Sequence, residues 1–268
     1  MSRQDPKAAA LEIVAERFAG AKVTFLGGSV IRKEATATSD LDLVVVYERV
    51  DTARRESFLH RDWPVEAFVH DPETLRYFFL EVDRPSGVPS LPDMVAGGVA
   101  LPAASDFSRS LQALAEEVIA LGPPAWSEQE LAASRYAITD LVDDLRIPKS
   151  TDELLATATQ LYCMAADHFF RAQRSWSAKG KSIPQRLTAT APQFAEQFSR
   201  AFRDVFNNGR TQAVIDLCEQ LLAPQGGWLF AGYRAEAPTA WRLSGTSPAG
   251  VPSDRADSRK QISGTEPP

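Results

Sequence analysis

The chain has 268 residues, of which 44% are hydrophobic and 24% are charged, and its formal net charge at pH 7 is −6. This length suits one large domain or two modest ones, and the composition is typical of a soluble globular protein. An acidic chain is a poor non-specific binder of nucleic acid, because phosphate binding needs clustered lysine and arginine. We therefore find no strong sign of a nucleic-acid partner.

The chain also shows no targeting or membrane signal. Its N-terminus has no apolar signal region, and no apolar run approaches the ~18 residues that a membrane helix needs. We expect a cytoplasmic protein with no membrane partner. The cysteines Cys163 and Cys218 both lie in apolar, helix-like stretches, so we expect two buried free thiols.

Strand and helix patterns alternate in the first third of the chain. Residues 7–18 have helical periodicity and end near Gly20, residues 22–26 form a short strand, and a Gly-Gly-Ser turn follows. Residues 30–39 are polar and predict a loop, which a helical turn could open, and residues 41–47 predict a buried strand.

The rest of this third continues the mixture. We interpret the charged stretch 51–60 as helix-like, residues 64–69 as a third strand, and residues 71–80 as a helix capped by Asp71 with Pro72 at its first position. Residues 84–102 are rich in proline and glycine and predict an irregular connection.

After Asp106 the patterns are helical only. We count about five helices from their periodicity, and two of them begin with capping-box spacing, at Ser127 with Glu130 and at Ser150 with Glu153. The tail is nearly free of apolar residues, which predicts disorder. The expected fold is α+β: a small mixed sheet in residues 1–102, a helical bundle in residues 103–234, and a disordered tail in residues 235–268.

Three polar features follow one another in the first domain. Gly28 and Ser29 come directly after a strand, Asp40 and Asp42 open the next strand, and Glu66 lies inside the strand after that. Residues two apart on a strand project from the same face, about 7 Å apart along the chain. Asp40 and Asp42 therefore share a face, and Glu66 can join them if its strand pairs with theirs.

Such a group of acids indicates a divalent cation. Three converging carboxylates repel one another and are hard to keep ionised, which a cation relieves. Oxygen ligands suit Mg²⁺, which shares its shell with phosphates and water. The Gly-Gly-Ser turn adds backbone N–H groups and a hydroxyl near a phosphate. Two metal ions could serve both sides of a phosphoryl displacement.

This order of residues resembles a known signature. Gly28-Ser29, ten further residues and then Asp40-Leu41-Asp42-Leu43 is similar to the signature of the polymerase-beta-type nucleotidyltransferases. The resemblance covers about residues 22–69 and implies transfer of a nucleoside monophosphate from ATP or another nucleoside triphosphate, with release of pyrophosphate. It implies that Asp40 and Asp42 bind two Mg²⁺ ions, that Glu66 binds the catalytic one, and that Gly28, Ser29 and Ser39 contact nucleotide.

The second half resembles a narrower group more loosely. Residues 136–145, 179–187 and 226–234 are similar to stretches of the antibiotic nucleotidyltransferases of the kanamycin and streptomycin kind, whose helical bundle closes the cleft. This resemblance does not identify a drug substrate.

Two charged clusters in this half each have two interpretations. Asp140, Asp143 and Asp144 form either a solvated helix face or an acidic wall that receives a cationic acceptor. Lys181 and Arg186, with Lys179 beside them, are expected in a loop between two helices and form either a helix-end cluster or a clamp on the triphosphate. We predict the acceptor role for the acids and nucleotide binding for Lys181 and Arg186.

The sequence leaves the reaction partner open. The partners are a nucleoside triphosphate and a hydroxyl-bearing acceptor, which we expect to be a small molecule. The alternatives are an enzyme that modifies a protein or a transfer RNA, as in toxin–antitoxin pairs, and a non-catalytic nucleotide-binding module. Acceptor identity, the preferred base and the oligomeric state do not follow from spacing.

Overall fold

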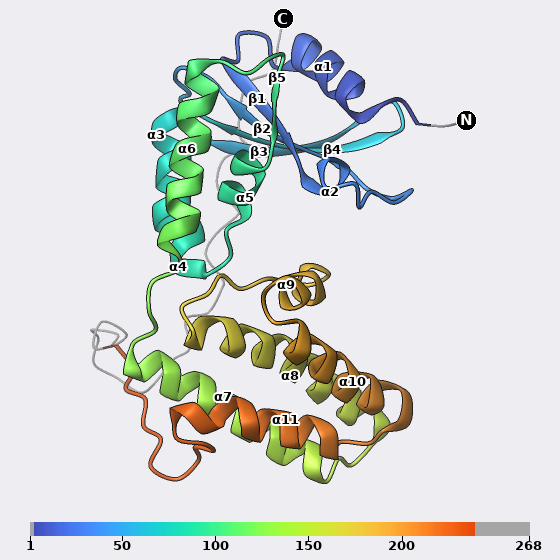
Figure 1. Cartoon of the computed structure of the whole chain (residues 1–268), viewed down its shortest axis with the longest axis vertical. Helices are drawn as coiled ribbons and strands as arrows, with labels where there is room; N and C mark the ends of the chain where they lie inside the picture. Colours follow the sequence, from blue (N-terminus) through green and yellow to red (C-terminus); the bar gives the residue numbers. More distant parts are fainter. Residues whose placement is uncertain (1–2, 239–268) are drawn as a thin grey trace, which may run out of the picture. The chain divides into compact units, whose positions relative to one another are not determined.

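A computed structural model describes residues 3–238 of the chain (Figure 1). Residues 3–233 form one compact unit. Most of the tail that the sequence predicts to be disordered, residues 239–268, lies outside the described residues.

The N-terminal region is built on a five-stranded mixed sheet. Its strand order is β3-β4-β2-β1-β5. The parallel pair β2 and β4 lies at its centre, and the other neighbours are antiparallel. The strands are β1 (Val23–Gly27), β2 (Leu41–Val46), β3 (Arg54–His60), β4 (Trp63–His70) and β5 (Val99–Leu101).

The pairing register aligns one row of residues across four strands. Gly27 of β1 pairs with Asp42 of β2, Asp42 pairs with Glu66 of β4, and Glu66 pairs with Ser57 of β3. Paired residues project from the same face of a sheet. The register therefore places two of the predicted acids side by side.

Helices cover both faces of the sheet (Figure 1). Helix α1 (Pro6–Arg17) packs Ala9 and Ile13 into a buried cluster with Leu43 and Val45. On the other face, α3 (Pro72–Tyr77), the π-helix η1 (Phe78–Asp83), α5 (Ser90–Ala96) and α6 (Asp106–Leu121) bury a second cluster that includes Phe25 and Val44. The short helices α2 (Gly28–Ile31) and α4 (Arg84–Ser86) complete this region.

The predicted helix at residues 51–60 is wrong, because Arg54–His60 is the edge strand β3. The side chains there alternate with a period of two. Phe58 packs against Phe18, the residue after α1, and His60 contacts Glu12 of α1, while Arg55 and Leu59 are exposed. Alternation of this kind is the pattern of a half-buried strand and outweighs the local charge density.

Two neighbouring predictions also need correction. Residues 84–102 were expected to be irregular, but they contain α4, α5 and strand β5. The helix expected to run to residue 80 ends as an α-helix at Tyr77 and continues as η1 to Asp83. Its start is as predicted, since Asp71 forms a capping box with Thr74.

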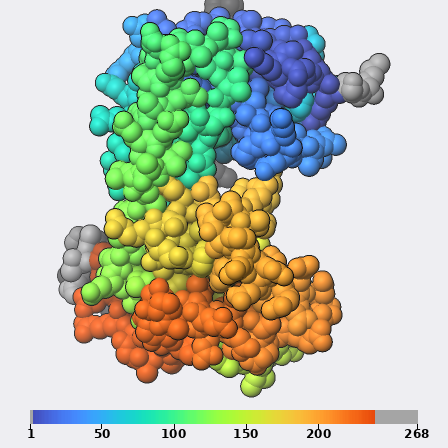
Figure 2. Space-filling view, in the orientation of Figure 1, coloured from blue at the N-terminus to red at the C-terminus, as the bar shows by residue number. Residues whose placement is uncertain are grey.

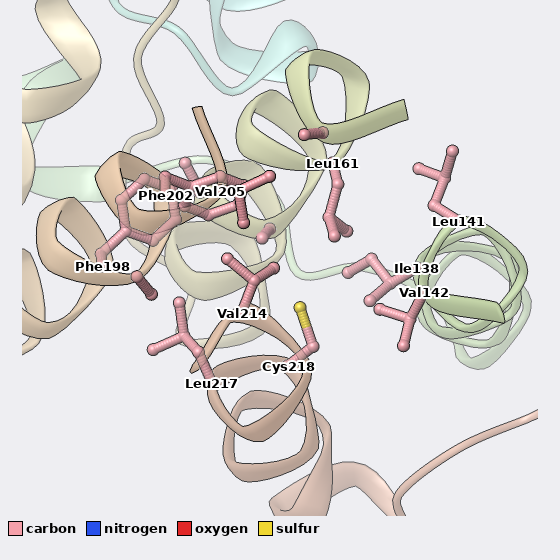
Figure 3. Close-up of a cluster of buried hydrophobic side chains, with 14 of the residues drawn as sticks. Ile138, Leu141, Val142, Leu161, Phe198, Phe202, Val205, Val214, Leu217 and Cys218 are labelled. Atoms are coloured by element: carbon pink, nitrogen blue, oxygen red, sulfur yellow. The ribbon is translucent and has the colours of Figure 1, made fainter. Parts of the chain in front are cut away.

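The second half is helical, as the periodicity predicts. Its helices are α7 (Glu128–Arg146), α8 (Thr151–Ala172), α9 (Ser182–Thr190), α10 (Pro192–Asn208), α11 (Gln212–Leu222) and the 3-10 turn η2 (Ala223–Gln225). Figure 3 shows their shared core, in which Leu161, Phe198 and Cys218 point toward one another.

Details of the helical half differ from the expectation. From Asp106 to residue 238 the structure has six α-helices, where the periodicity indicates about five. Ser127 forms the expected capping box, whereas at Ser150 only the serine half is present, since the Glu153 carboxylate accepts instead from the Lys149 N–H. Cys218 is buried as predicted, but Cys163, which lies in α8, is exposed.

Helix α6 follows the expected domain boundary at residue 102, yet it packs on the N-terminal region. It packs Leu111 and Val118 against the sheet and runs along the surface of the N-terminal region (Figure 2). The buried helical core, in contrast, contains residues of α7 to α11. The boundary stays a prediction.

Among the described residues, no helix is both long enough and apolar enough to cross a membrane.

Candidate functional site

The three predicted acids come together. Asp40 directly precedes β2, Asp42 is the second residue of β2, and Glu66 is its register partner on β4. Each offers one carboxylate oxygen, and these oxygens lie within 4.8 Å of one another. All three side chains are half-buried, so they remain reachable from solvent.

The electrostatics of Asp42 show how tightly the acids converge. Burial, with the negative charges of Asp40 and Glu66 adding to it, raises the pKa of the Asp42 carboxyl to about 6. Positive charge on Arg32 and Lys181 acts in the opposite direction on this pKa. An oxygen-only donor set with excess negative charge matches the chemistry of a hard divalent cation such as Mg²⁺.

Gly28 forms the wall of the site next to Asp42. Its φ is +73°, and a Cβ built on it would lie 1.9 Å from Oδ2 of Asp42. Only glycine fits this position, because it tolerates positive φ and has no side chain to collide with the carboxylate. The predicted turn therefore brings its backbone directly against the acids.

Ser29 and Ser39 are also brought together. The Ser29 hydroxyl donates to Oγ of Ser39 over 3.1 Å, and Oγ of Ser39 also accepts from the Thr36 N–H over 2.8 Å. Ser39 is 7% exposed. These bonds connect the turn after β1 with the residue that precedes β2 by two positions. Ser39 therefore stabilises the position of this turn, and its predicted contact with nucleotide stays a prediction.

The helical half places basic residues close to this site. Lys181 precedes α9, and its charge acts on Asp42. Arg186 lies within α9, not in the loop expected for it, and donates to Oδ2 of Asp93 over 2.7 Å. Lys181 is exposed and its nucleotide contact stays a prediction, whereas the Arg186 guanidinium is engaged by a carboxylate of the N-terminal region.

The acids predicted to bind the acceptor lie on α7, apart from the three acids of the sheet. Asp140, Asp143 and Asp144 are exposed on α7, and the Asp143 carboxylate accepts from Arg146 one turn later over 3.2 Å. None of the described contacts connects these carboxylates with Asp40, Asp42 or Glu66. Their acceptor role stays a prediction.

Sequence reasoning missed one residue of the site. Arg55 donates from Nη2 to Oε1 of Glu66 over 2.6 Å, and its guanidinium lies over the Phe68 ring. The period-two alternation of residues 54–60 was the signal that could have placed Arg55 on the same sheet face as Glu66.

A comparison with protein families agrees with this geometry. Residues 8–81 match the family model of a nucleotidyltransferase domain. The matched segment spans just over a quarter of the chain and contains Gly28, Ser29, Asp40, Asp42 and Glu66. The nucleotidyltransferase segment thus coincides with the turn and acids that the structure brings together.

Two further comparisons add little to this match. The solved structure of a nucleotidyltransferase-like protein from Exiguobacterium sibiricum is similar, with 14% sequence identity, a TM-score of 0.40, and coverage of 82% of this chain and 75% of that chain. No curated protein sequence matches the chain.

Proposed function

We propose that this protein is a metal-dependent nucleotidyltransferase, which transfers a nucleoside monophosphate from ATP or another nucleoside triphosphate to an acceptor hydroxyl. The observation that carries the proposal is the close approach of the Gly28 backbone to Asp42, whose register partner is Glu66. The arrangement sets backbone N–H groups, which can bind phosphate, directly beside a pair of carboxylates, which can bind a divalent cation.

Asp40, Asp42 and Glu66 would hold two Mg²⁺ ions, which would neutralise phosphate charge and activate the acceptor oxygen. Backbone N–H groups at Gly28 and Ser29 would receive the β- and γ-phosphates from the other side. The half-buried carboxylates keep the site partly screened from water, which strengthens electrostatic interactions within it.

The reaction forms a bond between the acceptor oxygen and the α-phosphorus and breaks the bond from that phosphorus to the bridging oxygen of the β-phosphate. Pyrophosphate leaves with its oxygen, and the proton of the acceptor hydroxyl passes to a carboxylate of the site. Lys181 would stabilise the charge that develops on pyrophosphate, since it is the basic residue of the helical half whose charge acts on Asp42.

We expect a small hydroxylated acceptor, because the net charge of −6 disfavours a polyanionic partner such as transfer RNA. An exposed acidic helix face at Asp140, Asp143 and Asp144 would suit a cationic acceptor, although no described contact brings it to the metal-type acids. The acceptor therefore has to be found by experiment.

Nucleotide binding tests the proposal before any acceptor is known. Melting temperatures of the wild type are measured with each of the four nucleoside triphosphates, with and without Mg²⁺. A ligand that binds the native state raises the melting temperature. We expect a rise that needs both Mg²⁺ and triphosphate and that disappears in Asp40→Asn and Asp42→Asn. A rise of equal size in these variants would refute the metal assignment.

A further inference from the structure

The side of the site formed by β3 carries a cation. β3 is the edge strand of the sheet, and its residues on the face of Asp42 and Glu66 are Arg55, Ser57 and Leu59. The side chain of Arg55 is 58% exposed, yet it is held at two points. It donates to Glu66 over 2.6 Å, and its guanidinium lies 5.2 Å from the centre of the Phe68 ring.

The register explains this placement. Ser57 pairs with Glu66 and Arg55 pairs with Phe68, so Arg55 lies diagonally across the strand pair from Glu66 on the same face. A diagonal neighbour is within reach of a long side chain. Arg54, the residue before it, points to the opposite face and pairs with Glu56.

We infer that Arg55 is a resident counter-ion of the third acid, which weakens binding of a free metal ion and makes the metal enter together with the triphosphate. The inference rests on the proposed function of the site. In the free protein, the guanidinium already neutralises part of the negative charge on Asp40, Asp42 and Glu66, and it occupies an oxygen that a metal could use.

The positive charge of Arg55 acts differently on a free metal ion and on a metal–triphosphate complex. A divalent cation that arrives alone meets the like charge of Arg55 a few ångströms away, which is unfavourable even at high dielectric. A metal that arrives with a triphosphate brings excess negative charge, toward which the same guanidinium is attractive. Arg55 would therefore oppose binding of metal alone and favour binding of the metal–nucleotide complex. It is a positioning residue, not a catalytic one.

Removal of the charge should reverse this preference. In Arg55→Ala, we expect Mn²⁺ alone to bind about three- to tenfold more tightly than in the wild type, the range expected for one nearby, partly screened charge. The affinity for Mn²⁺ with a non-hydrolysable triphosphate should stay the same or fall. Arg55→Lys keeps the charge and should bind Mn²⁺ alone within about twofold of the wild type.

The test measures Mn²⁺ binding by electron paramagnetic resonance, with and without a non-hydrolysable triphosphate. Arg54→Ala is the matched control, since it removes a neighbouring arginine from the other face of the same strand. Asp42→Asn reports whether the bound Mn²⁺ is at the acids at all. Melting temperatures without metal confirm that each variant is folded.

The outcomes separate the two proposals. Tighter Mn²⁺ binding in Arg55→Ala, but not in Arg54→Ala or Arg55→Lys, supports the counter-ion role. Unchanged or weaker binding in Arg55→Ala, while Asp42→Asn still abolishes binding, overturns this inference and leaves the proposed function standing. Binding that survives Asp42→Asn, or no binding with or without triphosphate, overturns the proposed function itself.

Discussion

Gly28 offers a sharp test of the site because the Asp42 carboxylate occupies the space that a side chain at residue 28 would need. In Gly28→Ala, the new Cβ would lie 1.9 Å from Oδ2 of Asp42, where ordinary contacts begin at 3.4 Å. The carboxylate and the turn must therefore move apart by more than 1 Å in total. The backbone at this position also has φ of +73°, which an alanine adopts only with strain.

Two magnitudes follow. An alanine in the left-handed region costs about 1–2 kcal/mol of folding free energy, which a protein of this size tolerates. A displacement of about 1 Å at reacting groups, in contrast, costs on the order of 100-fold in rate. We therefore expect Gly28→Ala to fold with slightly lower stability and to lose most of its magnesium-dependent binding of triphosphate and its activity.

Urea unfolding measures the stability change, and the rise in melting temperature with Mg²⁺ and triphosphate measures binding. Gly20→Ala is the control, since Gly20 has φ of +86° and a Cβ there would meet nothing within 4 Å. It should lose similar stability and keep full binding. If Gly28→Ala bound metal and triphosphate as the wild type does, the Gly28 backbone would not belong to the phosphate site.

Three further predictions concern other parts of the molecule. Lys181→Ala should weaken triphosphate binding more than monophosphate binding in isothermal titration calorimetry, because the lost cation would face the β- and γ-phosphates; equal weakening would make Lys181 an ordinary surface charge. Burial lowers the pKa of His70 to about 4. The unfolded chain therefore binds more protons between pH 6.5 and 4, and stability should fall by about 2–3 kcal/mol as the pH drops through this window. His70→Gln should flatten that dependence in urea titrations, and an unchanged slope would assign the acid sensitivity to other groups. A thiol reagent such as Ellman's reagent should label one cysteine in the native protein, since Cys163 is exposed while burial raises the pKa of Cys218 to about 12; labelling of both would contradict the packing of α11.

The sequence was sufficient for the residues that determine the site. Asp40, Asp42 and Glu66 lie two residues apart or on adjacent strands, so strand geometry alone predicts that they share a face once their strands pair. The Gly-Gly-Ser turn after the first strand likewise predicts that Gly28 lies near the site. The actual contact between Gly28 and Asp42 depends on the antiparallel pairing of β1 with β2, which no local pattern specifies.

The errors arose where one local pattern hid another or where a partner lies far away in the sequence. Residues 54–60 form a strand because they pair with β4 across a short turn, and their many charged residues obscured the period-two alternation that marks it. For this reason, Arg55 escaped notice. Arg186 likewise pairs with Asp93, a partner that spacing within the helical half cannot reveal. Helical periodicity, which depends on neighbouring residues only, predicted the second half well.

The most direct test of the central claim is to follow the label of a radioactive nucleotide. The protein is incubated with Mg²⁺, a fraction of small hydroxylated metabolites, and a triphosphate labelled at either the α- or the γ-phosphorus. Nucleotidyl transfer predicts that the α-label appears in a new product, that the γ-label appears in pyrophosphate, and that Asp42→Asn gives neither. A γ-label in the new product, or transfer that survives Asp42→Asn, would contradict the proposed reaction.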